Sequence, residues 1–354
     1  TNRVKSYSLL WSLKRIKNPI RAILINSGNA NVLGGADGWR TTCGIMEEFA
    51  SVLNINSTHL LFASTGIIGK PLPEKKIVSA LKTLVESASY YGGNDAAEAI
   101  MTTDRFPKQA ECEIPIKTRR KNQQVRIGAM AKGAGMICPN MATMLAFITT
   151  DAVISKPALK KALKHAVNNS FNMITVDNDQ STNDFVVCLA SGLARNKTIH
   201  PDSEDFEKFS EGLLHVCCLL AQKIAENGEG ADRLIEVRIE QAWSEKDARK
   251  IAKKIAGSNL VKTAVTGAWP NWGRIAASAG SASSRLNPQK MKIWIGNHIV
   301  FDGNPCNVNE TILKEELSKQ KVVITLSLNL GKANAVAWGC NLTEQYVRIN
   351  MEKE

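Results

Sequence analysis

Short apolar runs alternate with longer amphipathic stretches along most of the chain. Runs such as Ala22–Ile25 and Leu60–Ala63 have the length of buried strands, and each ends in a small polar loop. In the stretches between such runs, apolar residues recur every three or four positions, a spacing that places them on one face of a helix. The pattern therefore predicts an α/β fold.

Three stretches predict helices by this spacing, at about residues 74–88, 156–168 and 203–224. The apolar positions of the third stretch stop before Asn227-Gly228, a pair that suits the end of a helix. We interpret these apolar faces as core surface rather than as cofactor-binding positions.

The pattern restarts after residues 228–230 with a strand over Leu234–Ile239 and a helix that opens at Ser244. Asp247, three residues after Ser244, completes a signature that resembles a capping box. The remaining predicted elements are strands over residues 293–301 and 322–328 and a helix over residues 310–317. We therefore expect a main domain over residues 1–235 and a smaller C-terminal α/β domain over residues 236–354.

The composition is that of an ordinary globular protein, with 44% hydrophobic and 22% charged residues in 354. The longest apolar runs fall far short of the ~20 residues that span a bilayer, so no membrane segment is predicted. No apolar secretory core follows the first charged residues. We expect a cytoplasmic protein, with the alternative that an organellar presequence has been removed.

The eight cysteines form no C-x-x-C pair, and most have apolar neighbours, which suits reduced cysteines in a core. The five histidines have no spacing typical of a metal site, and the chain contains neither G-x-G-x-x-G nor a Walker loop. The sequence therefore predicts neither a metal ion nor a nucleotide cofactor.

The formal net charge of +12 favours anionic ligands. The densest basic run, residues 117–121, has no interleaved aromatic residues on which bases could stack. We interpret this run as a solvated turn, and we expect small-molecule partners rather than nucleic acid.

Residues 131–148 combine a glycine-rich loop with an apolar strand, and Thr143 lies at the junction. If the Ala142–Thr143 bond were cut, the hydroxyl and the freed α-amine of Thr143 would serve as nucleophile and general base on one residue. Gly133 and Gly135 would permit the unusual backbone that self-cleavage needs. The pattern alone, however, favours a structural threonine at the start of a strand.

The same segment resembles the processing and nucleophile segment of the ornithine acetyltransferase family, whose usual form is close to K-G-[SA]-G-M-x-x-P-x-x-A-T-M-L. Ordered matches continue along the whole chain. They are Asn26–Asn31, Ser64–Gly69, Met101–Asp104, Ser181–Asp184, Gly228–Ala231, Pro270–Arg274, Ala337–Cys340 and Tyr346–Asn350.

The resemblance implies a layered αββα sandwich of the self-processing N-terminal-nucleophile type. It also implies a bifunctional glutamate N-acetyltransferase of arginine biosynthesis, an acyltransferase that moves acetyl from N2-acetyl-L-ornithine to L-glutamate. Transfer would be ping-pong through acetyl-Thr143, after autoproteolysis between Ala142 and Thr143. The family uses no metal or organic cofactor and assembles as a heterotetramer of two α and two β chains. Whether acetyl-CoA is also a donor stays open.

Site residues follow from the resemblance, position by position. Thr65 and Gly66 match the pair that forms the oxyanion hole. The implied substrate contacts are Thr102, Lys132, Thr143, Glu229 and Asn350. A lysine suits an α-carboxylate, and a glutamate suits the ammonium end of ornithine. Asn183, Asp184 and Asn271 lie in matching motifs, and we interpret them as structural supports.

The chain also departs from the family pattern. Trp269 stands where the family usually has Asp, Leu33 replaces a common Cys, and Asn329 replaces Asp. Family members usually carry several tens of residues before the segment that begins here at Thr1, and a hydroxyl-bearing last residue where this chain has Glu354. Two alternatives therefore stay open. One is a related self-cleaving amidase or aminopeptidase that passes the acyl group to water. The other is an N-terminally truncated, inactive homologue that binds anions or nucleic acid.

Overall fold

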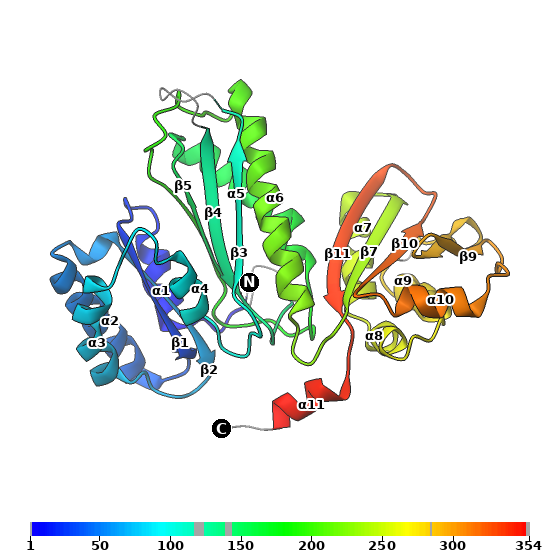
Figure 1. The fold of residues 1–354 in the computed structure, drawn as a ribbon, viewed down its shortest axis with the longest axis horizontal. Helices are drawn as coiled ribbons and strands as arrows, with labels where there is room; N and C mark the ends of the chain where they lie inside the picture. The colour runs from blue at the N-terminus through cyan, green and yellow to red at the C-terminus, as the bar shows by residue number, and fades with distance from the viewer. Residues whose placement is uncertain (1, 117–123, 139–143, 284, 352–354) are drawn as a thin grey trace. The chain divides into compact units, whose positions relative to one another are not determined.

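The computed structural model describes residues 2–116, 124–138, 144–283 and 285–351 (Figure 1). Helices and strands alternate along it, which confirms the predicted α/β class. The helices are α1 Tyr7–Arg15, α2 Gly35–Leu53, α3 Glu74–Glu86, α4 Gly93–Ala99, α5 Lys156–Asn169, α6 Glu204–Glu226, α7 Glu245–Ala256, α8 Asn259–Thr266, α9 Gly273–Gly280, α10 Glu310–Leu317 and α11 Glu344–Met351. The strands are β1 Ala22–Asn29, β2 Leu60–Ile67, β3 Lys108–Ile114, β4 Val125–Lys132, β5 Leu145–Thr150, β6 Phe185–Ala190, β7 Leu234–Ala242, β8 Lys292–Ile295, β9 His298–Asp302, β10 Lys321–Ser327 and β11 Ala333–Cys340.

The chain forms two compact units that interleave in sequence. The first contains Thr1–Gly133, Asn140–Leu159 and Gln180–Lys208, and the second contains Ala134–Pro139, Lys160–Asp179 and Phe209–Glu354. The domain boundary expected between residues 235 and 236 stays a prediction.

The first unit contains two sheets. β1 and β2 form a parallel pair, and the second sheet has the order β3-β4-β5-β6, with β4 antiparallel to β3 and β5 and with β6 parallel to β5. Leu145 at the start of β5 pairs with Lys132 on one side and with Phe185 on the other. The start of β5 therefore lies between the end of β4 and the start of β6.

Strand β2 is buried on both faces. Its alternating side chains Leu60 and Phe62 join a core with Trp11 of α1 and with residues of α2 and α3, two helices that lie side by side in Figure 1. Leu61 and Ala63 point the other way, into a cluster with β5 and β6. Burying a large apolar side chain stabilises the fold by about 1.5–3 kcal/mol, so β2 holds helices on one face and the second sheet on the other. Within this unit the layers run helix, sheet, sheet.

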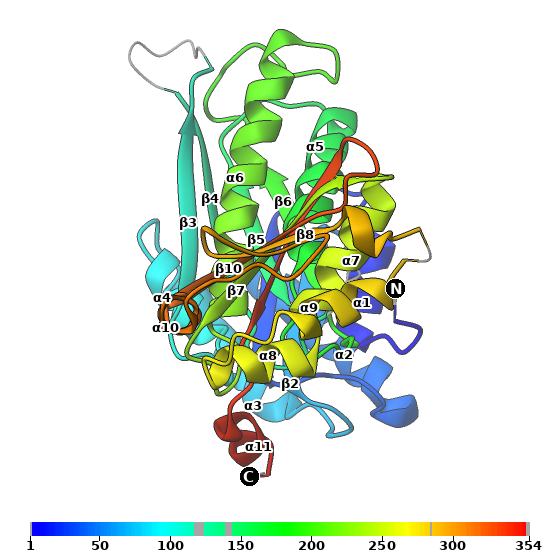
Figure 2. The same ribbon diagram turned by 90° about the vertical axis from the view of Figure 1, so that its right-hand side faces the viewer.

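The second unit is built on a five-stranded sheet of order β11-β7-β10-β8-β9. Helix α7 packs on β7 and β11, with α9 beside it (Figure 2). Its buried residues Ala248, Ile251, Ala252 and Ile255 recur at helical spacing. The Ser244 hydroxyl accepts a hydrogen bond from the Asp247 backbone N–H, so the predicted N-cap is confirmed.

The predicted helices over residues 74–88, 156–168, 203–224 and 310–317 correspond to α3, α5, α6 and α10 within two residues at each end. The single strand expected over residues 293–301 is wrong. It is a hairpin of β8 and β9, because the chain reverses at Gly296, whose φ of 58° favours glycine. None of the described helices is long and apolar enough to cross a membrane. All eight cysteines lie among the described residues and are free thiols.

Candidate active site

Three predicted site residues meet in the first unit. The Lys132 ammonium, at the end of β4, donates to the Thr102 hydroxyl at 2.6 Å and to the Thr65 hydroxyl at 3.4 Å. Lys132 is only 7% exposed, so its charge lies in a largely dehydrated setting. The sequence positions these residues far apart, and the strand ends bring them together.

Asp104 lies beside the Lys132 ammonium, a role that the sequence pattern does not predict. Its carboxylate lies 3.6 Å from the Lys132 ammonium and accepts from the Lys108 ammonium at 2.6 Å and the Gly133 backbone N–H at 2.7 Å. Burial alone would raise the pKa of Asp104, but Lys132 and Lys108 outweigh burial, and the pKa is lowered. Asp104 is therefore a fixed anion beneath Lys132. The signal was present, since Asp104 closes the Met101–Asp104 motif.

The predicted oxyanion pair lies at the end of β2. Gly66 has a φ of 129°, and a Cβ there would lie 2.2 Å from the Gly28 carbonyl carbon on β1. Only glycine fits at this position. The close approach of β1 fixes the backbone at Gly66, and with it the direction of the Gly66 N–H and of the neighbouring Thr65 side chain.

Asn183 ties this region to the start of β6. Its amide donates to the carbonyl of Ser64 at 2.7 Å and to the carbonyl of Ala30 at 2.5 Å. It therefore joins the ends of β1 and β2 to the second sheet, as expected of a structural support.

The other two described substrate-contact candidates meet in the second unit. The Asn350 amide of α11 donates to the Glu229 carboxylate at 3.0 Å. The backbone N–H of Glu229 donates to the Ala134 carbonyl at 3.0 Å, and a Cβ on Gly135 would lie 2.4 Å from the Glu229 carboxyl carbon. Glycine at position 135 therefore lets the loop lie directly against the Glu229 carboxylate.

Asp177 holds the same loop, and no sequence motif predicts this role. Its carboxylate accepts from the backbone N–H groups of Met136 at 2.6 Å and Ile137 at 2.9 Å. Burial raises the pKa of Asp177, which these hydrogen bonds partly offset. Burial and the nearby carboxylates of Asp177 and Glu229 also raise the pKa of the Tyr346 hydroxyl to about 12, so this α11 side chain stays neutral at physiological pH.

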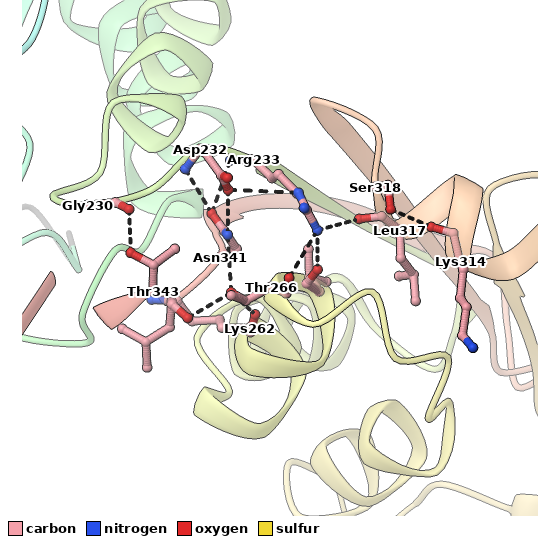
Figure 3. Close-up of polar contacts among 12 residues, drawn as sticks. Gly230, Asp232, Arg233, Lys262, Thr266, Lys314, Leu317, Ser318, Asn341 and Thr343 are labelled. Atoms are coloured by element: carbon pink, nitrogen blue, oxygen red, sulfur yellow. Dashed lines mark hydrogen bonds and ion pairs between the residues drawn. The ribbon is translucent and has the colours of Figure 1, made fainter. Parts of the chain in front are cut away.

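A polar network fixes the loop that carries Glu229 (Figure 3). The Asn341 side chain accepts from the backbone N–H groups of Asp232 and Arg233, and the Arg233 guanidinium donates to Val265 and Leu317 carbonyls at the ends of α8 and α10. Cations at helix C-termini are favourable. Thr343 follows Asn341 by two residues, and its hydroxyl donates to the Gly230 carbonyl at 2.6 Å. The segment leading into α11 is thereby tied to the Glu229 loop.

The predicted nucleophile and scissile bond, Thr143 and Ala142, lie outside the described residues, as does the basic run 117–121. Met144, directly after Thr143, is buried, and its carbonyl accepts from the Phe185 N–H at 2.9 Å. Among the described residues no group of His, Cys, Asp and Glu side chains could hold a metal ion.

Two of the three departures from the family pattern, Trp269 and Asn329, have local explanations. Trp269 is 49% exposed, and the Arg274 guanidinium lies 4.5 Å from its ring centroid, a cation–π contact that keeps the ring on the surface. Asn329 has a φ of 50°, which asparagine tolerates, and its amide donates to the Lys290 carbonyl at 2.6 Å. Leu33 is exposed at a φ of 59°, for which we find no structural reason.

Comparison with known proteins gives close matches over the whole chain. The model of the ArgJ family matches residues 1–353. The arginine biosynthesis bifunctional protein ArgJ of Symbiobacterium thermophilum is 45% identical over 352 residues, which cover 99% of this chain and 87% of that protein. The ArgJ of Caldanaerobacter subterraneus is 41% identical over 356 residues, with the same coverage. A crystal structure of ArgJ from Bacillus halodurans is 42% identical, with a TM-score of 0.57, and the match covers 58% of this chain and 98% of that one.

Proposed function

This chain belongs to the ArgJ family, and we propose that it transfers an acetyl group from N2-acetyl-L-ornithine to L-glutamate through Thr143. Membership makes it an acyltransferase of arginine biosynthesis with the layered α/β fold of that family. The residues that perform the transfer, and the cut before Thr143, are our proposal.

The contact of Lys132 with Thr65 and Thr102 is the observation that carries the proposal. Lys132 pairs with Leu145 at the start of β5, two residues after Thr143 in the sequence. A buried cation and two hydroxyls therefore lie beside the strand that follows the proposed nucleophile. A purely structural strand start has no need of such a group.

The chemistry begins when the Thr143 hydroxyl attacks the acetyl carbonyl and its proton passes to the α-amine of Thr143. Negative charge develops on the carbonyl oxygen, where the Thr65 hydroxyl and the Gly66 N–H would stabilise it. The C–N bond then breaks, the proton moves to the ornithine nitrogen, and the acetyl group stays on Thr143 as an ester. The glutamate amine attacks this ester and reverses the sequence.

Substrate charges match the two described clusters. Lys132 offers a cation to an α-carboxylate, and Asp104 holds that cation in place. Glu229 would receive the ammonium end of ornithine, with its carboxylate oriented by Asn350. Thr102 keeps the Lys132 ammonium directed along the strand end.

The extent of a solved relative supports the cut. A chain that runs from Thr143 to Glu354 would hold three fifths of this sequence. The solved Bacillus halodurans chain, matched over 98% of its length, covers 58% of this one. A β chain of this kind has the corresponding size.

The remaining parts of the proposal come from the family. They are an assembly of two α and two β chains, action in the cytoplasm, and small amino-acid substrates. Acetyl-CoA as a second donor has no nucleotide-binding motif in its favour.

Intact-protein mass spectrometry tests the proposal. Purified protein should contain two chains that meet between residues 142 and 143, and Thr143→Ala should stay whole. Brief incubation with N-acetylornithine should then add one acetyl group to the chain that begins at Thr143. A single full-length chain in folded wild-type protein would contradict the mechanism.

Product analysis separates the alternatives. With glutamate present, acetylglutamate should accumulate, whereas an amidase would release acetate at the same rate with or without glutamate. An inactive homologue would form no acyl-Thr143 at all, and salt-dependent binding of nucleic acid would then favour an anion-binding role.

A further inference from the structure

A band of lysines runs along one face of α7. Lys246, Lys250 and Lys254 recur every four residues, and all three are exposed. The buried residues of α7, such as Ile251 and Ile255, lie on the other side of the helix. None of the three lysines forms an ion pair with a residue that the structure describes.

Helix stability does not explain this band. Like charges four residues apart destabilise a helix. Cations are favourable in the last turn of a helix, where Lys254 lies, but unfavourable in the first turn, where Lys246 lies. The Asp247 carboxylate of the first turn already accepts from the Ser244 hydroxyl at 3.0 Å. The lysines therefore leave a positive charge that this helix does not balance.

The same face of α7 lines two adjoining hollows in the surface of the second unit. Their volumes are about 410 and 350 Å³, and Lys250 and Ala282 line both of them. The two hollows therefore form one groove, the α7 groove, between α7 and the turn that follows α9, a helix that lies beside α7 (Figure 2). Its volume is that of a site for a small molecule.

The lining of the α7 groove is strongly cationic. Its cations are Lys246, Lys250, Lys253, Lys254 and Arg285. Asp247 is the one carboxylate among its described lining residues, so the side chains of the groove carry a formal charge of four positive. A ligand with a single negative charge would leave most of this charge unbalanced, whereas a ligand with several would not.

Lys253 is the most enclosed of these cations. Burial lowers the pKa of its ammonium, and a hydrogen bond to the Cys138 thiol opposes this effect. An anion in the groove would also favour the charged form of Lys253. Because the ammonium is partly dehydrated, its attraction for that anion is stronger than that of a lysine in open water.

Trp243 borders the groove beside Arg285. Its side chain is 61% exposed, and the Arg285 guanidinium carbon lies 5.1 Å from its ring centroid. An exposed indole next to a set of cations can stack on the base of a nucleotide while the cations contact the phosphates.

We propose that the α7 groove binds an oligophosphate, a chain of two or more phosphates that is either free or part of a nucleotide. Lysine ammonium groups are compact cations that contact phosphate oxygens from many directions, so four of them can follow a chain of phosphates. The α7 groove lies within the second unit and does not involve the acetyl transfer. The inference therefore stands independently of the proposed function.

Isothermal titration calorimetry with sodium tripolyphosphate, at a salt concentration of about 0.15 M, tests the inference. Wild-type protein should bind tripolyphosphate at one site. The double variant Lys250→Ala, Lys254→Ala should bind it about tenfold more weakly or less, because two charge-assisted contacts are lost. Removing like charges from an exposed helix face does not threaten the fold, and equal melting temperatures check this.

The double variant Lys160→Ala, Lys164→Ala is the matched control. It removes two exposed lysines with the same spacing from α5, and neither of them lines the α7 groove. This variant should bind tripolyphosphate as wild type does. Equal weakening in both double variants would overturn the inference, because it would reflect net charge alone, and so would the absence of binding to wild-type protein.

Titration with ATP in the absence of divalent cations distinguishes the two sources of the phosphate chain. Tighter binding of ATP than of tripolyphosphate, with the difference lost in Trp243→Ala, would identify a nucleotide ligand. Equal binding of the two, unchanged in Trp243→Ala, would identify an inorganic chain. ATP binding that is insensitive to Lys250→Ala, Lys254→Ala would place the nucleotide elsewhere and would overturn the inference.

Discussion

At the scale of single residues, the Thr65 hydroxyl donates no hydrogen bond to any residue that the structure describes. Its oxygen accepts from the Lys132 ammonium, so the hydroxyl proton can be donated elsewhere. We predict that Thr65→Ala slows acetyl transfer by about 10²–10³ in kcat, the usual effect of removing one oxyanion-hole donor. Steady-state kinetics with N-acetylornithine and glutamate measure this.

Thr65→Ser is the matched control, because it keeps the hydroxyl and loses only a methyl group. It should retain most of the activity, and both variants should keep the wild-type melting temperature within a few degrees. Equal activity of the alanine and serine variants would remove Thr65 from the oxyanion hole.

Asp184 also predicts a pH dependence of stability in the uncut protein. The pKa of Asp184 is about 8 in the fold and about 3.9 in the unfolded chain. The contribution of this group to the free energy of unfolding is therefore fully present below the unfolded pKa and is lost as the pH rises to 8. In Thr143→Ala, the free energy of unfolding should fall between pH 5 and pH 8, by at most about 1.4 kcal/mol per pH unit from this group. Urea denaturation at several pH values measures the slope.

Adding Asp184→Asn to Thr143→Ala should flatten the dependence of the free energy of unfolding on pH. Adding Asp95→Asn instead should leave this dependence unchanged. A slope that is the same in all three proteins would mean that Asp184 titrates normally in the fold.

The candidate site residues are predictable from the sequence where they lie in a motif that matches the family. Thr65, Thr102 and Lys132 came from matched segments, and the structure brings them together. Asp104 and Asp177 were not singled out, because one aspartate in a loop has no periodicity and acts only through partners distant in sequence. Whether the predicted residues form one substrate site stays a prediction.

At the scale of elements, the β1–β2 pair depends on glycine at position 66. Alanine there would need a φ of 129° and would place its Cβ 2.2 Å from the Gly28 carbonyl carbon. Backbone strain and overlap each cost about 1–3 kcal/mol, so we predict that Gly66→Ala unfolds at markedly lower temperature and is not cut. Thermal unfolding and a denaturing gel measure both effects.

Gly69→Ala separates strain from overlap. Gly69 has a φ of 83°, but a Cβ there would meet no heavy atom within 4 Å. Gly69→Ala should lower the free energy of unfolding by only about 1–2 kcal/mol, and the variant should still be cut before Thr143. Equal effects at both positions would mean that strain alone, and not the close approach of β1, restricts Gly66.

Helix α11 provides a test of the Glu229 cluster. Asn350→Ala removes the amide that donates to Glu229, so we predict a several-fold rise in the KM for N-acetylornithine with self-cleavage intact. Gln345→Ala, an exposed position on the same helix, is the control and should change neither parameter. A fall in kcat with unchanged KM would contradict a substrate-binding role.

The elements show what sequence patterns can and cannot predict. Helices with a broad apolar face, such as α3 and α6, were placed within two residues. The apolar pattern predicts one strand where the β8–β9 hairpin lies, because apolar residues continue on both sides of Gly296. Strand order was not predictable from the residues, because the pairing of β5 with β4 and β6 depends on contacts that no local pattern encodes.

At the scale of the whole molecule, cutting before Thr143 should not separate the two chains. Strands β1 to β4 belong to the upstream chain, and β5 and β6 belong to the downstream chain. The ladder from Lys132–Leu145 to Ile127–Thr150 therefore joins the chains within one sheet, and Asn183 of the downstream chain holds the carbonyls of Ala30 and Ser64. Such backbone ladders and the apolar cluster beneath them do not depend on the cut bond.

We predict that native mass spectrometry shows both chains together, in particles of twice the mass of the uncut protein, whereas denaturing gels show two bands. Thr143→Ala should give the same native mass and one band, because the fold precedes the cut. Lys5→Ala, in which an exposed contact near the N-terminus is lost, should behave as wild type in both measurements. An upstream chain that elutes alone under native conditions would mean that β4 and β5 do not pair after the cut, and the Lys132 cluster would then lack the strand that carries the nucleophile.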